Sequence, residues 1–264
     1  MIKSVKLFTN EDNKSQDIEK HLIKSLINNG INIVNEDYDL AIAIGGDGSF
    51  LRMVRSTNFD SKPYYVGINS GTLGFLQEVK RDEIDKLIDE IVNEKYKIDE
   101  IGIQETDIYY DNKNTKVYSL NEIIVRDENL KVLRSDIFIE NELLETFNGD
   151  GILIATSSGS TAHNLAYGGS IVDTGFSTLQ ITPIAPVNSS VYHTLTNSVI
   201  VSSDKKVIIK PQTKTNNVMV IVDGIVNEYN NVDSIVTNIK NKKIKCLRFS
   251  HYNFPQKINE KLLH

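Results

Sequence analysis

Three glycines surround a single acid in the stretch AIAIGGDGSF, residues 41–50. An apolar run leads into the glycines and a helix-like segment follows, an order found at the carboxyl edge of parallel sheets, where open α/β proteins bind ligands. Gly45, Gly46 and Gly48 let phosphate oxygens approach the main chain, and the start of a helix adds amide donors. The pattern therefore indicates a phosphate-binding turn. It is not a P-loop, because no Lys-Ser or Lys-Thr follows, and its glycine spacing is not that of the dinucleotide fingerprint.

Asp47 conflicts with a simple phosphate-binding turn. A carboxylate about 4 Å from a phosphate charge costs on the order of 1 kcal/mol in water and about 4 kcal/mol at an effective dielectric constant of about 20. A functional role thus requires that Asp47 hold a bridging cation or accept a proton from an attacking hydroxyl. The alternative is that Asp47 only caps the following helix.

Three further stretches have residue types that suit a nucleotide site. INSGTLGFLQEV, residues 68–79, is a second glycine turn that either walls a site beside Asp47 or is an ordinary turn with packed apolar side chains. Asn121 and Glu122 open an apolar run, and such a pair either reads ribose hydroxyls or an adenine edge or has no special role. Residues 148–170, NGDGILIATSSGSTAHNLAYGGS, are rich in hydroxyls and amides that suit a phosphate, a nucleobase or a plain helix cap.

Covalent and metal chemistry are not expected from the side chains. Ser160 and His163 lie three residues apart without a G-x-S-x-G turn or an acid to orient the imidazole. The histidines have no metal-ligand spacing, so we expect any catalytic metal to be Mg²⁺ carried by a nucleotide. The single cysteine, Cys246, is expected to be a packing residue.

The elements that must position these residues change type near residue 100. Up to that point strand-like and helix-like patterns alternate, which predicts an α/β domain with a parallel, doubly wound sheet over residues 1–100. One of its helices is expected within residues 15–29, with Ile18, Leu22, Leu26 and Ile27 on one face and Gly30 just beyond its end. Strand-like runs dominate afterwards, apart from a helical stretch near residues 161–167. We therefore predict a second, strand-rich domain over residues 101–240.

The bulk composition restricts the partners. The 264 residues carry a formal net charge of −6, which argues against a nucleic-acid binder. No apolar run of membrane-spanning length and no signal peptide occur, so we expect no membrane partner and a cytoplasmic location.

Taken in order, GGDGS, NSGTLGFL, LNE, SSGSTAH and GGSIV resemble the motifs of the NAD kinase family, in its short bacterial form. That family transfers a phosphoryl group from ATP or inorganic polyphosphate to the 2′-hydroxyl of the adenosine ribose of NAD, with a divalent cation such as Mg²⁺. The resemblance implies a β-sandwich for the second domain and a tail, residues 241–264, that returns to the first domain. It also implies a homodimer or homotetramer in which subunits share the active site.

The resemblance assigns roles to particular residues. Asp47 is expected to be the catalytic proton acceptor. The implied NAD site comprises Asp47, Gly48, Phe75, Leu76, Asn121, Glu122, Asp150, Ser158, Thr161, Ala162, His163, Ala166, Ala185 and Asp223. The candidate ligands of the phosphate donor are Gly45, Gly46, Gly48, Arg52 and Arg55, although both arginines also fit solvated helix charges.

Two positions depart from the family pattern. Ser157 replaces a proline, and His163 stands where a tyrosine is common, so protonation of the imidazole is expected to make NAD affinity depend on pH.

Two other functions stay open: a kinase of the same motif type acting on a sugar or lipid, and a nucleotide-binding sensor without activity. Formation of NADP from NAD, ATP and Mg²⁺ separates all three.

Overall fold

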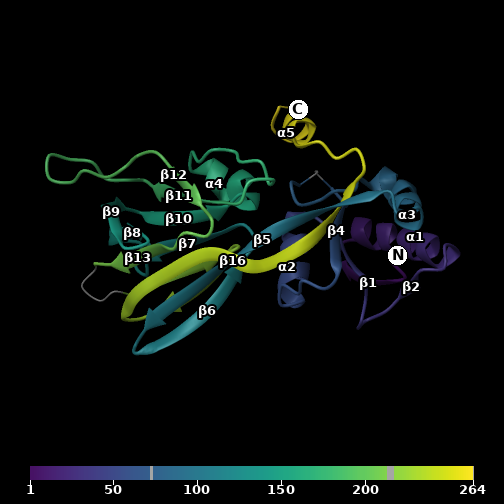
Figure 1. Ribbon diagram of the computed structural model, residues 1–264, viewed down its shortest axis with the longest axis horizontal. Coiled ribbons are helices and arrows are strands. Elements are labelled where there is room, and N and C mark those ends of the chain that lie inside the picture. Colours follow the sequence, from purple (N-terminus) through teal and green to yellow (C-terminus); the bar gives the residue numbers. More distant parts are fainter. Residues whose placement is uncertain (72–73, 213–216, 264) are drawn as a thin grey trace. The chain divides into compact units, whose positions relative to one another are not determined.

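The computed structural model describes residues 1–71, 74–212 and 217–263 of the chain (Figure 1). It divides into two compact units, the first formed by Met1–Ile101 with Lys243–His264 and the second by Gly102–Lys242. Along the chain, strands β5 (Tyr96–Tyr110) and β16 (Val232–Phe249) each begin in one unit and end in the other. The units are described separately below.

A parallel sheet forms the centre of the first unit. Its strands are β1 (Ser4–Thr9), β2 (Asn32–Ile33), β3 (Leu40–Gly45) and β4 (Tyr64–Asn69), in the order β2-β1-β3-β4, and β16 pairs parallel with β4. All six residues of β3 are buried, as a continuous apolar run predicts for an inner strand covered on both faces. The predicted α/β class of this part of the chain is confirmed.

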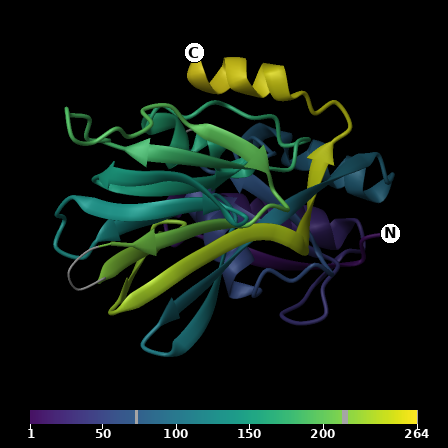
Figure 2. The ribbon, with the colours of Figure 1, turned by 60° about the vertical axis from the view of Figure 1, so that its left-hand side comes forward.

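Helices connect and flank these strands. They are α1 (Asn13–Asn28), α2 (Asp47–Ser56), α3 (Ile84–Val92) and α5 (Phe254–Leu262), with a 3-10 turn, η1, at Arg81–Glu83. Figure 2 shows α5 as a separate helix beyond the end of β16. Helix α5 and β16 thus bring the last described part of the chain into the first unit.

Both ends of α1 are determined by local sequence. The Asp12 carboxylate accepts the Ser15 backbone N–H at 3.0 Å as the N-cap. At the other end Gly30 has φ +72°, and its N–H and that of Ile31 bond to Ile27 and Leu26 as in a Schellman motif. Leu26 is buried, but Ile27 is 62% exposed, so its predicted inward position is wrong. At 100° per residue, Ile27 lies on the side of the helix opposite Ile18.

Two antiparallel sheets make up the second unit. The six-stranded sheet has the order β12-β11-β10-β7-β14-β15, and the other contains β16, β13, β8 and β9, with β5 pairing β6. The bounds are β6 (Lys113–Ser119), β7 (Glu122–Asp127), β8 (Leu133–Ile139), β9 (Glu142–Gly149), β10 (Gly151–Thr156), β11 (Thr178–Ile184), β12 (Val199–Ser202), β13 (Val207–Pro211), β14 (Val218–Val222) and β15 (Ile225–Tyr229). One apolar core takes side chains from both sheets, including Ile154 of β10 and Ile137 of β8. The strand-rich prediction is confirmed.

The helical stretch expected near residues 161–167 is shorter than predicted. A 3-10 turn, η2 (Ser158–Thr161), and a single turn, α4 (His163–Ala166), are separated by Ala162, whose φ of −92° and ψ of −135° are not helical. Gly168, with φ +81°, follows α4 directly. This segment is therefore a series of short turns and not one continuous helix.

No helix within the described residues combines the length and the apolar character needed to cross a membrane.

Candidate active site

The glycine turn joins the buried strand β3 to α2. Gly46 is the N-cap of α2 with extended backbone angles and contributes no side chain, so the first amides of the helix are not capped by it. Gly45 has φ +151°, and a side chain there would collide with the Ser49 hydroxyl. The turn therefore has open backbone at the positive end of a helix, the arrangement that binds phosphate oxygens.

The Asp47 carboxylate holds the second glycine loop. Its Oδ2 accepts the backbone N–H of Phe75 at 2.7 Å, and its Oδ1 accepts that of Leu76 at 2.9 Å. The alternative in which Asp47 only caps α2 is therefore wrong, because the N-cap of α2 is Gly46 and both oxygens of Asp47 accept amides of the second glycine loop. A Cβ at Gly74 would collide with this carboxylate, which explains the glycine at that position. A carboxylate has about four acceptor sites, so two remain for other donors.

Polar side chains surround the glycine turn. Gln77 is buried, and its Nε2 donates to the Gly46 carbonyl at 2.7 Å. The Arg52 guanidinium reaches back from the middle of α2 to Asn10 and Ser49, at 2.9 Å from each. Arg52 and Ser49 line a pocket together with Phe8, Thr9, Asn10, Met53 and Ser56. Arg55 lies in the last turn of α2, further along the helix from the glycine turn.

In the second unit Asp223 organises the LNE segment. Its carboxylate accepts the backbone N–H groups of Leu120 and Asn121, both at 2.8 Å, and of Glu122 at 3.2 Å. Asp223 has φ +44° at the turn between β14 and β15, followed by Gly224 at φ +82°. The turn thus places one carboxylate against three consecutive backbone amides. These bonds fix the backbone from which the Asn121 and Glu122 side chains extend.

Glu122 and His163 form a contact between strand β7 and helix α4. His163 Nδ1 lies 3.1 Å from Glu122 Oε1, and the Glu122 side chain is only 4% exposed. Burial, and secondly the charge of Asp223, raise the pKa of Glu122 to about 8. The Glu122 carboxyl is therefore largely protonated at neutral pH and can donate a hydrogen bond to the imidazole.

Hydrogen bonds hold the η2 turn against the LNE segment. The Thr156 hydroxyl donates to the Leu120 carbonyl at 2.6 Å and accepts the Gly159 N–H at 3.0 Å. The hydroxyl of Ser157 bonds to the Phe176 carbonyl at 2.5 Å, which ties down the position where the family pattern has a proline. Ser158, Thr161, Ala162, His163 and Ala166 all lie in these turns.

Asp150 and Ala185 form a separate group. The Asp150 N–H bonds to the Ile184 carbonyl beside Ala185, at the start of β10, whereas Glu122 pairs with Ala155 near its end. At about 3.3 Å per residue, the five steps from Asp150 to Ala155 along β10 keep these groups roughly 17 Å apart. The structure therefore brings Asn121, Glu122, Asp223 and the η2–α4 turns together but not Asp150 and Ala185.

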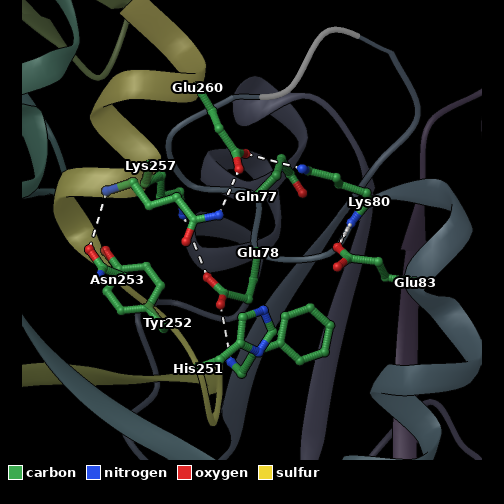
Figure 3. A pocket seen from close by; sticks show the side chains of 11 residues that line it. Gln77, Glu78, Lys80, Glu83, His251, Tyr252, Asn253, Lys257 and Glu260 are labelled. Atoms are coloured by element: carbon green, nitrogen blue, oxygen red, sulfur yellow. Dashed lines mark hydrogen bonds and ion pairs between the residues drawn. The ribbon is translucent and has the colours of Figure 1, made fainter.

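Several buried ionic residues of the first unit were missed in the sequence. Glu78 and Arg248, each about 95% buried at the side chain, form an ion pair at 3.3 Å, and Lys257 Nζ of α5 lies 3.5 Å from the same carboxylate. Figure 3 shows Lys257 of α5 facing Glu78, which lies in the loop after β4. The one signal available in the sequence was the spacing of Lys257 and Lys261, which places two cations on one helix face.

A glycine turn at a helix start binds phosphates, and an aspartate fixed inside it can orient an attacking hydroxyl, so the site fits a phosphotransferase. The family models of the ATP-NAD kinase N-terminal domain and the ATP-NAD kinase C-terminal domain match residues 1–96 and 120–246. The chain therefore belongs to the NAD kinase family. Membership of this family confirms the predicted activity, the phosphorylation of NAD.

Individual relatives agree with the family models. The NAD kinase of Finegoldia magna is 35% identical over 94% of this chain and 93% of its own length. NAD kinase 2 of Bacillus subtilis is 30% identical over 99% of this chain and 98% of its own. Neither relative nor family model favours a sugar kinase, a lipid kinase or a sensor.

Two solved structures share the fold. Yeast NADH kinase complexed with NADH matches with a TM-score of 0.86 at 22% identity, over 99% of this chain and 87% of that one. An NAD kinase from Archaeoglobus fulgidus in complex with ATP matches with a TM-score of 0.76 at 18% identity, over 97% and 98%. At these identities the likeness concerns the fold.

Proposed function

We propose that the enzyme transfers the terminal phosphoryl group of ATP to the 2′-hydroxyl of the adenosine ribose of NAD, with Asp47 as the proton acceptor. The observation that carries this role is the pair of backbone N–H groups, from Phe75 and Leu76, that hold the Asp47 carboxylate at 2.7 and 2.9 Å. A carboxylate fixed in this way beside a phosphate-binding turn has lone pairs left to orient a hydroxyl.

The proposed reaction begins with the donor phosphates on the amides of the glycine turn, near Arg52. The 2′-oxygen attacks the terminal phosphorus, its O–H proton passes to Asp47, a new O–P bond forms and the bond to the ADP oxygen breaks. A free aspartate has a pKa near 3.9 and is a weak base at pH 7. We therefore expect late proton transfer, with orientation of the hydroxyl as the larger contribution of Asp47.

A divalent cation fits this site only as a companion of the nucleotide. Among the described residues, no cluster of three or more His, Cys, Asp or Glu side chains could hold a metal ion. Mg²⁺ is commonly bound by one or two carboxylates together with substrate phosphates, and Asp47 is the acid at this turn that could ligate it. The cation would neutralise charge on the donor phosphates. Polyphosphate presents the same phosphate oxygens and is the alternative donor to test.

The NAD site is proposed to lie around the LNE segment and the η2–α4 turns. Asn121 and Glu122 would read the nucleoside, with Asp223 holding their backbone and His163 at the exposed edge. Asp150 and Ala185 lie at the far end of β10, which supports their joining the NAD pocket of a second copy. We therefore propose a homodimer or homotetramer with shared sites, as the family resemblance implies, in the cytoplasm.

The test measures NADP formed by the purified protein from NAD, ATP and Mg²⁺, beside NAD binding by calorimetry. For Asp47→Asn we expect NAD binding to be kept and a turnover lower by about 100-fold or more, the usual size of a lost acid–base group; part of that loss comes from the new amide group, which faces the N–H of Phe75 or Leu76. Near-normal turnover of this variant would overturn the assignment of Asp47. Binding of NAD without any product from the unmodified protein would favour the sensor. Replacing ATP by polyphosphate identifies the donor.

A further inference from the structure

Helix α5 directs two lysines, Lys257 and Lys261, toward the loop that follows β4. They lie four residues apart and so share one face of the helix. Both ammonium nitrogens are enclosed, and neither has a hydrogen-bond partner within the described part of the chain. Burying a charged amine without full compensation is costly, so the charges at these two positions call for an explanation.

Lys257 is accounted for by a buried ionic cluster. Its Nζ lies 3.5 Å from Glu78 Oε2, and the same carboxylate faces Arg248 Nη1 at 3.3 Å and accepts the Phe249 N–H at 3.0 Å. Arg248 also contacts Asp99 at 3.1 Å. Figure 3 shows Lys257 of α5 opposite Glu78. This cluster attaches α5 to the unit and explains the position of Lys257.

Lys261 has a different neighbour, the ring of Phe75. Its Nζ lies 5.2 Å from the ring centroid, within the range of a cation–π contact. The backbone N–H of the same Phe75 donates to Asp47 at 2.7 Å. Helix α5 is held beside this loop by the ion pair between Glu260 and Lys80 at 3.1 Å. One residue, Phe75, therefore contacts both the α5 cation and the proposed proton acceptor.

We propose that Lys261 is a positioning residue for Asp47, acting through Phe75: the ammonium over the ring fixes the Gly74–Leu76 loop and thereby the direction of the Asp47 carboxylate. The inference rests on the proposed role of Asp47. Both carboxylate oxygens are held by amides of this loop, so a shift of the loop turns the carboxylate away from the acceptor hydroxyl. Small displacements of a reacting group cost much of the turnover while leaving substrate binding intact.

The contact requires a charged lysine. Burial lowers the pKa of Lys261 to about 8, while the charges of Asp47 on α2, Glu260 on α5 and Glu78 in the loop oppose this shift, and Lys80 adds to it. The cation–π contact is thus present below pH 8 and is lost as the pH rises through this value. Lys257 on the same helix face, whose pKa is lowered by burial to about 7, and Glu122 also lose their protons in this region, so the part of an alkaline fall in turnover that belongs to Lys261 is the part that Lys261→Arg removes. An arginine keeps its charge throughout.

The experiment compares kcat and KM of the full-length variants Lys261→Met and Lys261→Arg at pH 7 and pH 9. For Lys261→Met we expect kcat to fall by about 2- to 30-fold, the range of a cation–π contact, with little change in the KM for NAD. Lys261→Arg should keep kcat at pH 7 and exceed the unmodified enzyme at pH 9. Lys86→Met is the matched control, because Lys86 Nζ also lies over a ring, 4.7 Å from the centroid of Phe249, and the backbone N–H of Phe249 donates to Glu78 instead of Asp47.

A double-mutant cycle tests the route through Phe75. In a Phe75→Leu background, Lys261→Met should lower kcat no further, whereas independent effects would add. An unchanged kcat for Lys261→Met, or the same alkaline loss in Lys261→Arg, would overturn the inference. If Lys261→Met does not fold, as judged by its thermal unfolding, the pH profile of Lys261→Arg decides. The Asp47→Asn result is independent: loss of turnover there with no effect at Lys261 refutes the positioning role alone.

Discussion

His163 Nδ1 lies 3.1 Å from the Glu122 carboxyl, so an exposed imidazole contacts a buried acid whose own pKa is about 8. The two partners differ in their exposure to water. Removal from water, followed by the charge of Asp223, keeps the proton on Glu122, whereas His163 remains more than half exposed. The contact therefore joins a buried acid that loses its proton near pH 8 to an exposed side chain, and each partner leads to a separate prediction.

Glu122 should make the free energy of unfolding depend on pH. Its pKa is raised from 4.5 when unfolded to about 8 when folded. Its contribution to stability is therefore fully present below pH 4.5, declines above it and is lost as the pH passes 8. Glu122→Gln stays neutral and should flatten this decline between pH 5.5 and 8.5. Urea unfolding at several pH values measures it, with the exposed Glu142→Gln as the control. An equally steep decline in Glu122→Gln would contradict the prediction.

His163 should contribute to NAD affinity from the exposed edge of the proposed site. Its side chain is 56% exposed, and its Nδ1 lies 3.1 Å from Glu122 Oε1, so the imidazole is held on one side and open to a ligand on the other. We expect His163→Ala to weaken NAD binding severalfold, the usual effect of losing about one hydrogen bond. His163→Tyr, with the side chain that is common in the family at this position, is the matched control and should bind NAD like the unmodified enzyme. Calorimetric titrations provide the measurement, and an unchanged dissociation constant for His163→Ala would count against His163.

Gly74 should tolerate no side chain. A methyl group there collides with the Asp47 carboxylate, so Gly74→Ala must displace either the loop or the acid. We expect turnover to fall by about 10-fold or more, in line with the sensitivity of catalysis to small misplacements. Gly71→Ala is the matched control, since a Cβ at Gly71 meets nothing within 4 Å. Equal turnover of both variants would show that the Asp47 contact is not needed.

Asp223 should stabilise the LNE segment. Asp223→Asn replaces one acceptor oxygen by an amide group that faces the Leu120 or Asn121 N–H. We expect a loss of about 1–3 kcal/mol in the free energy of unfolding, the cost of a buried donor without a partner. NAD affinity should weaken with it. Asp233→Asn, at an exposed position of β16, is the control, and matching urea midpoints for the two variants would refute the prediction.

Local patterns in the sequence were enough to predict most elements. The run LAIAIG is the fully buried strand β3, and the cap residues Asp12 and Gly30 lie at the ends of α1. The strand pattern and the helix caps depend on neighbouring residues only. The face of α1 was partly wrong at Ile27 because a position next to a buried residue lies 100° away from it. The helix predicted near residues 161–167 was longer than the observed one, because the backbone at Ala162 is determined by its surroundings and not by helix preference.

The sequence by itself determined the chemistry of this protein: a glycine turn with one acid, a second glycine turn, an Asn-Glu pair and a hydroxyl-rich turn, in the order of the NAD kinase family. Only the tertiary structure decided what each side chain touches. Asp47 meets residues 28 and 29 positions away, and Asp223 meets amides more than 100 positions away. Lys261 reaches Phe75 from the other end of the chain. Such contacts depend on how strands pair and helices pack, which no local pattern records.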